Sequence, residues 1–328
     1  MVTKDKKLKR GCLLLLLLVM FSSCSQKTSN KVGLLLHEME GRWHADVEHL
    51  QKYAAKAGLD LIIKVANGDE NKQLMQAREL VREGVSVMMI VAVNQNTAAG
   101  IVRIAQNAGI KTIAYDRIIQ NAELDYFLTY NYEEIGRLQA EYALQKIPAG
   151  NYVMLWGDAS DNNARQMRTS QEKALKQYIN SGDVNLIYRA FIENWSWDNT
   201  QKVMQRIVDF SDRKVDVVLA SNDNIALAAL NVFEKNGMTP PQIITGQDAT
   251  NLACQSIVKG GQTMTIYKPT DQMAQKAIEL VNEVIRGEKA SNISSYVNNQ
   301  RKNIPTLFLT PVVVDKENVL SIIKNEAN

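Results

Sequence analysis

The chain has few cysteines and few histidines, and this shortage limits the chemistry it can perform. Of its three cysteines, Cys12 and Cys24 lie in an N-terminal segment that has the features of a leader, and the one thiol left, Cys254, makes no internal disulfide. All three histidines fall within residues 37–49, with no cysteine or carboxylate set at ligand spacing, which argues against zinc. No G-x-S-x-G motif and no phosphate-binding glycine-rich loop occurs. The sequence therefore predicts no metal and no cofactor.

The N-terminal segment has the composition of a secretory signal. Five Lys or Arg residues within positions 4–10 precede the apolar run Cys12–Phe21, which is too short for a comfortable membrane span. Two serines and Cys24 follow, and this ending resembles the bacterial lipoprotein signal, in which a cysteine is lipidated and becomes the first residue. We predict a signal peptide over residues 1–23, lipid attachment at Cys24, a polar tether over residues 24–30 and an extracytoplasmic, membrane-anchored protein. The alternative is an ordinary cleaved signal with an incidental cysteine.

The leader also distorts the charge of the chain. The full sequence has a formal net charge of +3, but residues 1–23 hold five Lys or Arg and one Asp. Without them, 33 of the 38 basic residues and 34 of the 35 acidic residues remain, so the net charge becomes −1. Because the apparent basicity belongs to the leader, it gives no support to a nucleic-acid partner.

Strand-like and helix-like segments alternate after residue 31 at intervals of about 25–30 residues, which is typical of βαβ units with a parallel sheet. Val85–Val93 is so continuously apolar that it predicts a strand covered on both faces. The pattern restarts near Tyr126, and a last strand is expected at Thr306–Val314. We predict an α/β fold of two Rossmann-like lobes with parallel sheets, joined by a three-segment hinge. The predicted lobes are residues 31–131 plus 269–305, and residues 132–268 plus 306–328.

Four apolar, β-prone runs in this pattern stop at polar or charged side chains. In open α/β sheets, ligands bind just beyond the carboxyl ends of the strands, so we expect these side chains to gather in one polar pocket. Carboxylates, amides and cations are suited to holding sugar hydroxyl groups. The residues at the four stops are Asp116-Arg117, Ser221-Asn222-Asp223, Gly246-Gln247-Asp248 and Lys268.

Each stop, taken alone, has a structural alternative. Asp116 and Arg117 could hold two neighbouring hydroxyl groups, but they could also form an ion pair at a turn. Asn222 could cap the helix that follows it, and Lys268 could be solvated. Asp116 and Asp248 could be the paired carboxylates of a glycosidase, but neighbouring cations would keep both ionised, which suits a general acid poorly.

Tryptophans also occur in polar segments of the chain. Trp43 follows Gly41-Arg42, and both Trp195 and Trp197 lie in a polar stretch that starts at Glu193. An indole in such a place can offer a flat face to the C–H side of a pyranose ring, although burial in a core is its commoner fate. Spacing alone does not separate Trp195 from Trp197.

Five short motifs occur in order, namely Ala114–Arg117, Asp161–Ala164, Ala220–Asp223, Gly246–Ala249 and Gln262–Pro269. With them the chain resembles the sugar-binding proteins of bacterial ABC importers, in the type I periplasmic binding protein family, over about Lys31–Leu320. Within that family the resemblance is strongest to xylose-binding members. It implies two lobes that close on one monosaccharide, with xylose or another pentose as the expected sugar, and a binding protein rather than an enzyme.

The resemblance also implies roles for individual residues. Trp43 and Trp195 would stack on the two faces of the sugar, which selects Trp195 over Trp197. The loop His37–Gly41 departs from the family, because it looks shorter by at least one residue. The residues implied to hydrogen-bond the sugar are Arg42, Asp116, Arg117, Asn163, Asn222, Asp248 and Lys268.

The expected partners follow from the same resemblance. It implies a monomer that delivers its sugar to the permease of an ABC importer and contacts the membrane through the lipid. A membrane sensor kinase that reads the closed form is the alternative, and the sequence does not separate the two. DNA-binding repressors of the same fold need a helix-turn-helix before the first strand, where this chain has its leader, so no nucleic-acid partner is expected.

Overall fold

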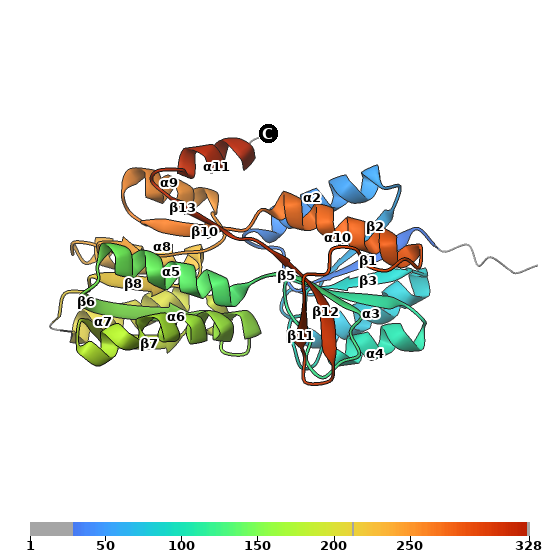
Figure 1. Cartoon of the computed structure of the whole chain (residues 1–328), viewed down its shortest axis with the longest axis horizontal. Helices are drawn as coiled ribbons and strands as arrows, with labels where there is room; N and C mark the ends of the chain where they lie inside the picture. Colours follow the sequence, from blue (N-terminus) through green and yellow to red (C-terminus); the bar gives the residue numbers. More distant parts are fainter. Residues whose placement is uncertain (1–28, 212, 327–328) are drawn as a thin grey trace, which may run out of the picture.

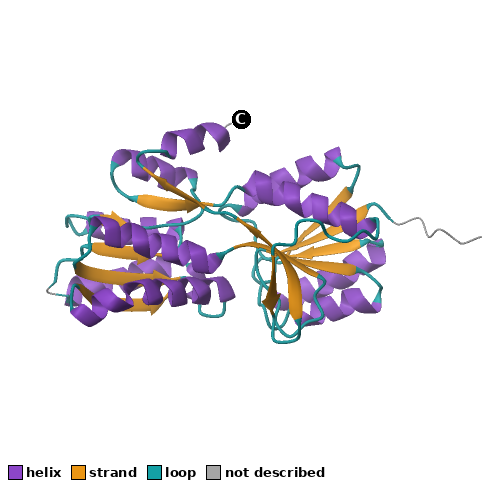
Figure 2. Ribbon diagram, viewed as in Figure 1, coloured by secondary structure: helices purple, strands orange, loops and turns teal. Residues whose placement is uncertain are grey.

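The computed structural model describes residues 29–211 and 213–326, which form two lobes side by side (Figure 1). Each lobe has strands in its middle and helices on both faces (Figure 2). This arrangement confirms the predicted α/β architecture of two lobes. Over the described ranges, no helix combines the length and hydropathy that a membrane crossing requires. The predicted signal peptide and Cys24 lie outside the described residues.

The first lobe contains a seven-stranded sheet in the order β11-β12-β5-β4-β3-β1-β2. Its neighbouring strands are parallel except for β11, which pairs antiparallel with β12. All four residues of β3 are buried, as the apolar run Val85–Val93 predicts for a strand covered on both faces. The strands are β1 (Lys31–Leu36), β2 (Asp60–Val65), β3 (Val87–Ile90), β4 (Lys111–Tyr115), β5 (Tyr126–Tyr130), β11 (Ser295–Asn298) and β12 (Asn303–Leu309).

Two pairs of helices cover this sheet, with α2 and α10 on one face and α3 and α4 on the other (Figure 1). Successive residues of β1 point to opposite faces, so Leu34 joins the core under α2 and α10 and Leu35 the core over α3 and α4. Local sequence sets the ends of α3, because Asp69 caps its first turn and Gly84 ends it with a φ of 76°. The helices are α2 (Trp43–Lys56), α3 (Glu70–Glu83), α4 (Ala99–Asn107) and α10 (Thr270–Ile285).

The second lobe has a four-stranded parallel sheet in the order β7-β6-β8-β9. α5 and α6 cover one face and α7 and α8 the other. α5 and α6 approach closely at Gly136, where an added Cβ would lie 2.5 Å from the backbone oxygen of Met167. The elements are β6 (Gly150–Trp156), β7 (Val184–Phe191), β8 (Val217–Ala220), β9 (Ile243–Ile244), α5 (Tyr132–Lys146), α6 (Asn162–Ser181), η2 (Glu193–Trp195), α7 (Trp197–Phe210) and α8 (Asp223–Lys235).

A two-stranded antiparallel ribbon, β10 with β13, extends the second lobe. Hydrogen bonds from the backbone of Thr263 to Ile244 and of Asp248 to Ile266 attach this ribbon to the end of β9. α9 and α11 pack beside it around a small apolar core. The elements are β10 (Met264–Tyr267), β13 (Val312–Asp315), α9 (Asn251–Lys259) and α11 (Val319–Glu326).

The last predicted strand and the predicted lobe boundary at residue 306 are wrong. Thr306–Val314 is not one strand, because β12 ends at Leu309 and pairs with β5 in the first lobe, whereas β13 begins at Val312 and pairs with β10 in the second. Pro311 lies between them, and a proline has no N–H group with which to continue a ladder. The chain therefore returns to the second lobe after Leu309.

The start of the first lobe also differs from the prediction. Ser29 and Asn30, predicted as the end of the tether, already hydrogen-bond to the fold. The side chain of Asn30 donates to the backbone oxygen of Gly58 at 3.0 Å, and its backbone oxygen accepts from Asp60. Any tether therefore ends before residue 29.

Three short crossings join the lobes, as the predicted hinge requires. They lie between β5 and α5 at Asn131, between β10 and α10 at Lys268-Pro269, and between β12 and β13 at Thr310-Pro311. The first two crossings are tied together, because the Tyr130 hydroxyl donates to the backbone oxygen of Pro269 at 2.8 Å. Short, mutually bonded crossings set how the strand ends of the two lobes face each other.

Replacing Gly136 by Ala should destabilise the protein by about 1–3 kcal/mol, the usual cost of overpacking, because the new Cβ meets backbone atoms of α6 that cannot move aside alone. Urea unfolding followed by circular dichroism measures this change in the free energy of unfolding. Gly100→Ala in α4 is the matched control. The added Cβ would first contact the flexible Leu74 side chain, at 3.2 Å. Alanine also has a higher helix propensity than glycine, so the free energy of unfolding should stay equal or rise. Wild-type stability in Gly136→Ala would contradict the close approach of α5 and α6.

Candidate functional site

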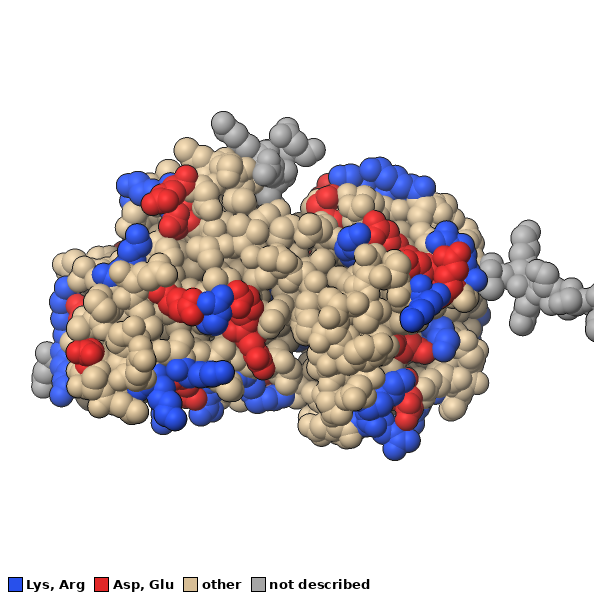
Figure 3. Space-filling model, in the orientation of Figure 1, with Lys and Arg blue, Asp and Glu red and all other residues tan. Residues whose placement is uncertain are grey.

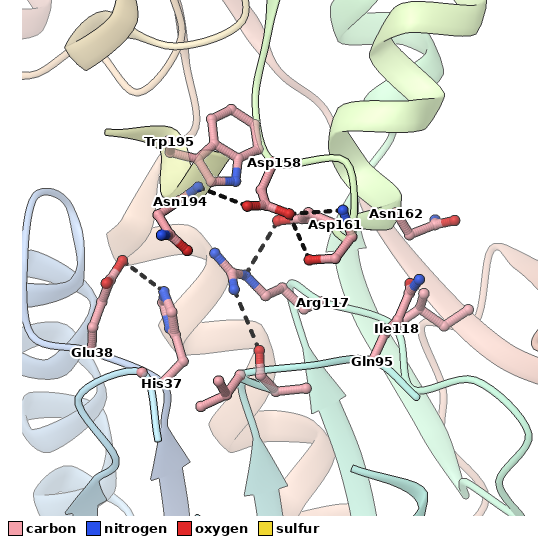
Figure 4. A pocket seen from close by; sticks show the side chains of 14 residues that line it. His37, Glu38, Gln95, Arg117, Ile118, Asp158, Asp161, Asn162, Asn194 and Trp195 are labelled. Atoms are coloured by element: carbon pink, nitrogen blue, oxygen red, sulfur yellow. Dashed lines mark hydrogen bonds and ion pairs between the residues drawn. The ribbon is translucent and has the colours of Figure 1, made fainter. Parts of the chain in front are cut away.

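A cavity of about 130 Å³ lies at the junction between the lobes (Figure 4). Its walls come from loops that follow β1, β2, β3 and β4 in the first lobe and β6 and β7 in the second. This is the placement that the rule for strand ends in α/β sheets predicts. The polar and aromatic lining includes His37, Glu38, Gln95, Arg117, Asp158, Asp161, Asn194 and Trp195.

Asp116, which precedes Arg117, belongs to a buried charged network that we call the junction cluster. Arg42 Nη2 lies 3.0 Å from Asp116 Oδ1, and Lys268 Nζ lies 3.0 Å from Asp248 Oδ1. Arg42 Nε lies 3.9 Å from that same oxygen of Asp248. The Tyr132 hydroxyl connects the two pairs, because it donates to Asp116 Oδ1 at 2.7 Å and accepts from Lys268 Nζ at 3.0 Å. The junction cluster consists of Arg42, Asp116, Tyr132, Asp248 and Lys268.

The electrostatics of the junction cluster keep Asp116 ionised. Burial opposes its ionisation, but the charges of Arg42 and Lys268 and the Tyr132 hydrogen bond outweigh burial and lower the pKa of Asp116 to about 2. A carboxylate with so low a pKa accepts hydrogen bonds and is a poor general acid, so the glycosidase alternative loses support. No group of His, Cys, Asp or Glu side chains among the described residues is arranged to hold a metal ion.

Asp46 supports Arg42 from behind. Its Oδ2 lies 3.1 Å from Arg42 Nη1, and its Oδ1 accepts a hydrogen bond from the Tyr115 hydroxyl at 2.6 Å. Burial raises the pKa of Asp46 despite the Arg42 charge. On the outer face in Figure 3, by contrast, charged side chains of both signs are interspersed over both lobes. Asp46, Asp116 and Lys268 are buried and paired with other charges at the junction, whereas the side chain of Asp248 is half-buried there.

Two more of the predicted residues link the lobes beside the cavity. Asn163 is 4% exposed at the start of α6, and its Nδ2 donates to the backbone oxygen of Asp116 at 3.3 Å. Arg117 Nε lies 3.6 Å from Asp161 Oδ2, and its Nη1 donates to the backbone oxygen of Ala92 at 3.4 Å. Both contacts of Arg117 are long, and a guanidinium has five N–H donors, so Arg117 retains donors for a ligand.

The two tryptophans predicted to stack on the sugar occupy different environments. Trp195 lines the cavity and packs on Gly157, where an added Cβ would lie 2.1 Å from its ring. Its buried indole N–H has no hydrogen-bond partner within the described residues. Trp43 is 7% exposed in the core of the first lobe, with the Arg42 guanidinium 4.3 Å from its ring centroid. The structure therefore brings Trp195 to the cavity and places Trp43 behind Arg42.

Asn222 has the structural role that the sequence left open. Its Oδ1 accepts the backbone N–H of Ile225 at 3.0 Å, which caps the first turn of α8. No hydrogen bond or ion pair joins its side chain to the junction cluster in the part of the chain that the structure describes. Capping occupies the oxygen of this side chain and leaves its NH2 group as a donor.

Several residues of the site have an unusual backbone. Eight described residues other than glycine have a φ between 49° and 102°. Each such conformation costs roughly 1–3 kcal/mol and persists only where the surroundings hold it, which happens often at functional sites. Five of the eight lie at the junction, namely Asp116, Asn194, Trp195, Asp248 and Ala249.

Other polar residues of the site were not predicted from the sequence. His37 and Glu38 follow β1, and the strand-end rule could have found them had it been applied to that strand. His37 Nε2 lies 2.9 Å from Glu38 Oε1, while burial and then the charge of Arg117 lower the pKa of His37 to about 4. No sequence pattern indicated that Tyr132 belongs to the site, because only the fold places the start of α5 against the end of β4.

The fold and its junction are those of a known class of protein. A family model described as the periplasmic binding protein domain matches residues 32–289. The D-xylose-binding periplasmic protein of Haemophilus influenzae is 33% identical, covering 92% of this chain and 91% of the relative. That of Escherichia coli K12 is also 33% identical, covering 88% of each. The chain therefore belongs to the periplasmic binding protein family.

A solved structure agrees with this assignment. The ABC transporter solute binding protein of Clostridium phytofermentans, with bound β-D-glucose, superimposes with a TM-score of 0.83 at 26% identity. The match covers 89% of this chain and 96% of that one. Within its family, the chain is thus a type I sugar-binding protein of the kind that serves ABC transporters, and its homologues are receptors rather than enzymes.

His37 should make stability depend on pH. Its folded pKa of about 4 lies below the ordinary value of 6.5, so between these values the unfolded chain binds a proton that the folded protein does not. Stability should therefore fall by about 3 kcal/mol as the pH drops from 6.5 to 4. Urea unfolding across this range, compared with His37→Gln, isolates the effect, because the variant lacks the titrating ring. Identical pH profiles would contradict the burial of a neutral His37.

Proposed function

We propose that this chain captures a monosaccharide between its lobes, with D-xylose as the first candidate, and delivers it to an ABC importer outside the cytoplasm. One observation carries the proposal: ionised and amide side chains from the strand ends of both lobes converge at one junction. Such a site suits a neutral ligand with many hydroxyl groups, because each hydroxyl can both donate and accept a hydrogen bond.

The junction offers acceptors and donors of the strong, charged kind. Asp116 and Asp248 accept hydrogen bonds from sugar hydroxyl groups, and Lys268 and Arg117 donate to hydroxyl oxygens. Asn163 adds an amide, and Arg42 adds a guanidinium that already faces both carboxylates. The face of Trp195 covers the apolar side of the ring. A sugar bound here would interact with both lobes at once, which favours the closed arrangement.

D-xylose is preferred as the ligand because two relatives named as D-xylose-binding are 33% identical over most of the chain. The solved relative with bound β-D-glucose is 26% identical, so a hexose is the natural competitor. The loop after β1 contributes His37 and Glu38 to the lining of the cavity, so we expect it to influence the choice between these sugars. A carboxylate at Glu38 can discriminate between sugars by the hydroxyl groups that reach the mouth of the cavity.

Delivery to an importer is proposed because the family match is to transporter binding proteins. A sensor kinase would use the same sugar pocket and would differ only in which membrane protein meets the closed lobes. The proposed lipid at Cys24 would keep the protein near either partner.

Titration with D-xylose, D-ribose, L-arabinose and D-glucose should change tryptophan fluorescence, because Trp195 lines the cavity. We expect D-xylose to bind most tightly. Replacing Asp248 by Ala should weaken that binding roughly 5- to 150-fold, since about 1–3 kcal/mol is lost with a charged acceptor. Asp216→Ala is the control, because Asp216 precedes β8 at the end away from the cavity. If millimolar concentrations of the three pentoses produce no response, the assignment of a pentose as the ligand is wrong.

The lipid anchor has its own test. Wild-type protein made in a bacterium should partition into the detergent phase of Triton X-114, whereas Cys24→Ser should stay in the aqueous phase, because the acyl chains are attached through that thiol. Both should bind sugar equally, since the lobes begin near residue 29. Aqueous partitioning of the wild-type protein would favour the ordinary cleaved signal instead.

A further inference from the structure

The loop that carries Asp248 has a strained backbone conformation that needs support from neighbouring groups. Asp248 and Ala249 follow β9 with φ values of 102° and 49°, conformations that side chains other than glycine rarely adopt. Two consecutive residues of this kind persist only where neighbouring groups fix them. The position of the Asp248 carboxylate at the junction therefore depends on whatever holds this loop.

A buried carboxylate at Asp223 holds it. Asp223 is 1% exposed at the start of α8, and its Oδ2 accepts the backbone N–H of Thr250 at 2.8 Å. Its Oδ1 accepts the Thr265 hydroxyl at 2.7 Å and the Gln262 side-chain amide at 2.8 Å. The Thr265 oxygen in turn accepts the backbone N–H of Ala249 at 3.1 Å. Asp223 thus fixes both residues that follow Asp248, one directly and one through Thr265.

The same carboxylate explains a glycine on the other side of Asp248. A Cβ at Gly246 would lie 2.2 Å from Asp223 Oδ1 and 2.2 Å from Gln262 Nε2. The backbone N–H of Asp223 also donates to the oxygen of Gln247 at 3.0 Å. The loop therefore wraps around Asp223 on both sides of Asp248, and three of the sequence motifs meet at this one side chain.

We propose that Asp223 is a positioning residue for sugar binding, which sets the Asp248 carboxylate through Thr250 and Thr265 without touching the ligand. This inference rests on the proposed function. All three groups that face the Asp223 oxygens are donors, so the site requires acceptors on both oxygens. An Asn side chain has the same shape, but it would turn an NH2 group toward at least one donor.

The charges of the two residues are also linked. Burial and the nearby charge of Asp248 raise the pKa of Asp223 to about 7. The three hydrogen bonds favour the ionised form but do not fully offset these effects. Measurements on this residue therefore belong at pH 8, where the carboxylate form predominates.

The test is a double-mutant cycle on D-xylose affinity at pH 8, measured by titration calorimetry. Asp223→Asn should weaken binding by about fivefold or more in the wild-type background, but by less than about twofold when Asp248 is already Ala. An equal loss in both backgrounds, or no loss in the first, would overturn the proposal. Thr265→Val should behave like Asp223→Asn and replaces it if that variant does not fold. Thr263→Val is its matched control, because among the described residues the Thr263 hydroxyl bonds to the backbone of Ile244 and not to Asp223 or Ala249.

A second readout separates this inference from the proposed function. Hydrogen exchange of the sugar-free protein should show faster exchange at the amides of Ala249 and Thr250 in Asp223→Asn, with the amides of α6 unchanged. Unchanged exchange at both amides would refute the positioning role even if the protein binds D-xylose. If the wild-type protein binds none of the four sugars while those amides lose protection, the proposed function fails and the control of the loop by Asp223 stands.

Discussion

The burial of Asp116 is the constraint on which the junction depends. This carboxylate is 3% exposed at the end of β4, and a buried charge without partners would be very costly. Its partners come from three separate parts of the chain: Arg42 from the start of α2, Tyr132 from the first crossing and Lys268 from the second. The Asp116 carboxylate has its charged and hydrogen-bonding partners only when these three parts of the chain meet. The chemistry of the site therefore depends on how the two lobes are arranged.

In the second lobe, buried polar side chains also help to position the site. The Trp156 indole donates to Gln171 at 2.8 Å, Gln171 donates to Gln139 at 2.7 Å, and Gln139 donates to the backbone oxygen of Gly246 at 2.9 Å. Together with Asp223, this buried chain connects α5, α6 and α8 to the loop after β9. A buried, hydrogen-bonded polar network of this kind makes the backbone beneath a binding site rigid.

Much of the fold could be predicted from the sequence, because an apolar run and its stop are local signals. Asp116, Asp248 and Lys268 were found by that rule, and the structure links all three. The rule could not place Trp43, since whether an indole faces a cavity or a core depends on what packs over it, here Arg42. It also joined two strands into one at Pro311, because both halves are equally apolar and only their pairing partners separate them.

The sequence by itself determined two α/β lobes, the strand ends at which polar side chains collect and the family to which these motifs belong. These follow from periodicity and short-range order, which neighbouring residues encode. Only the tertiary structure decided that Asn222 caps a helix, that His37 and Glu38 line the cavity, and that Arg42 reaches Asp248. The contact of Arg42 with Asp248, and the cavity that His37 and Glu38 line together with residues of the second lobe, join parts that are far apart in the chain. Three short crossings, rather than any local pattern, bring those parts together.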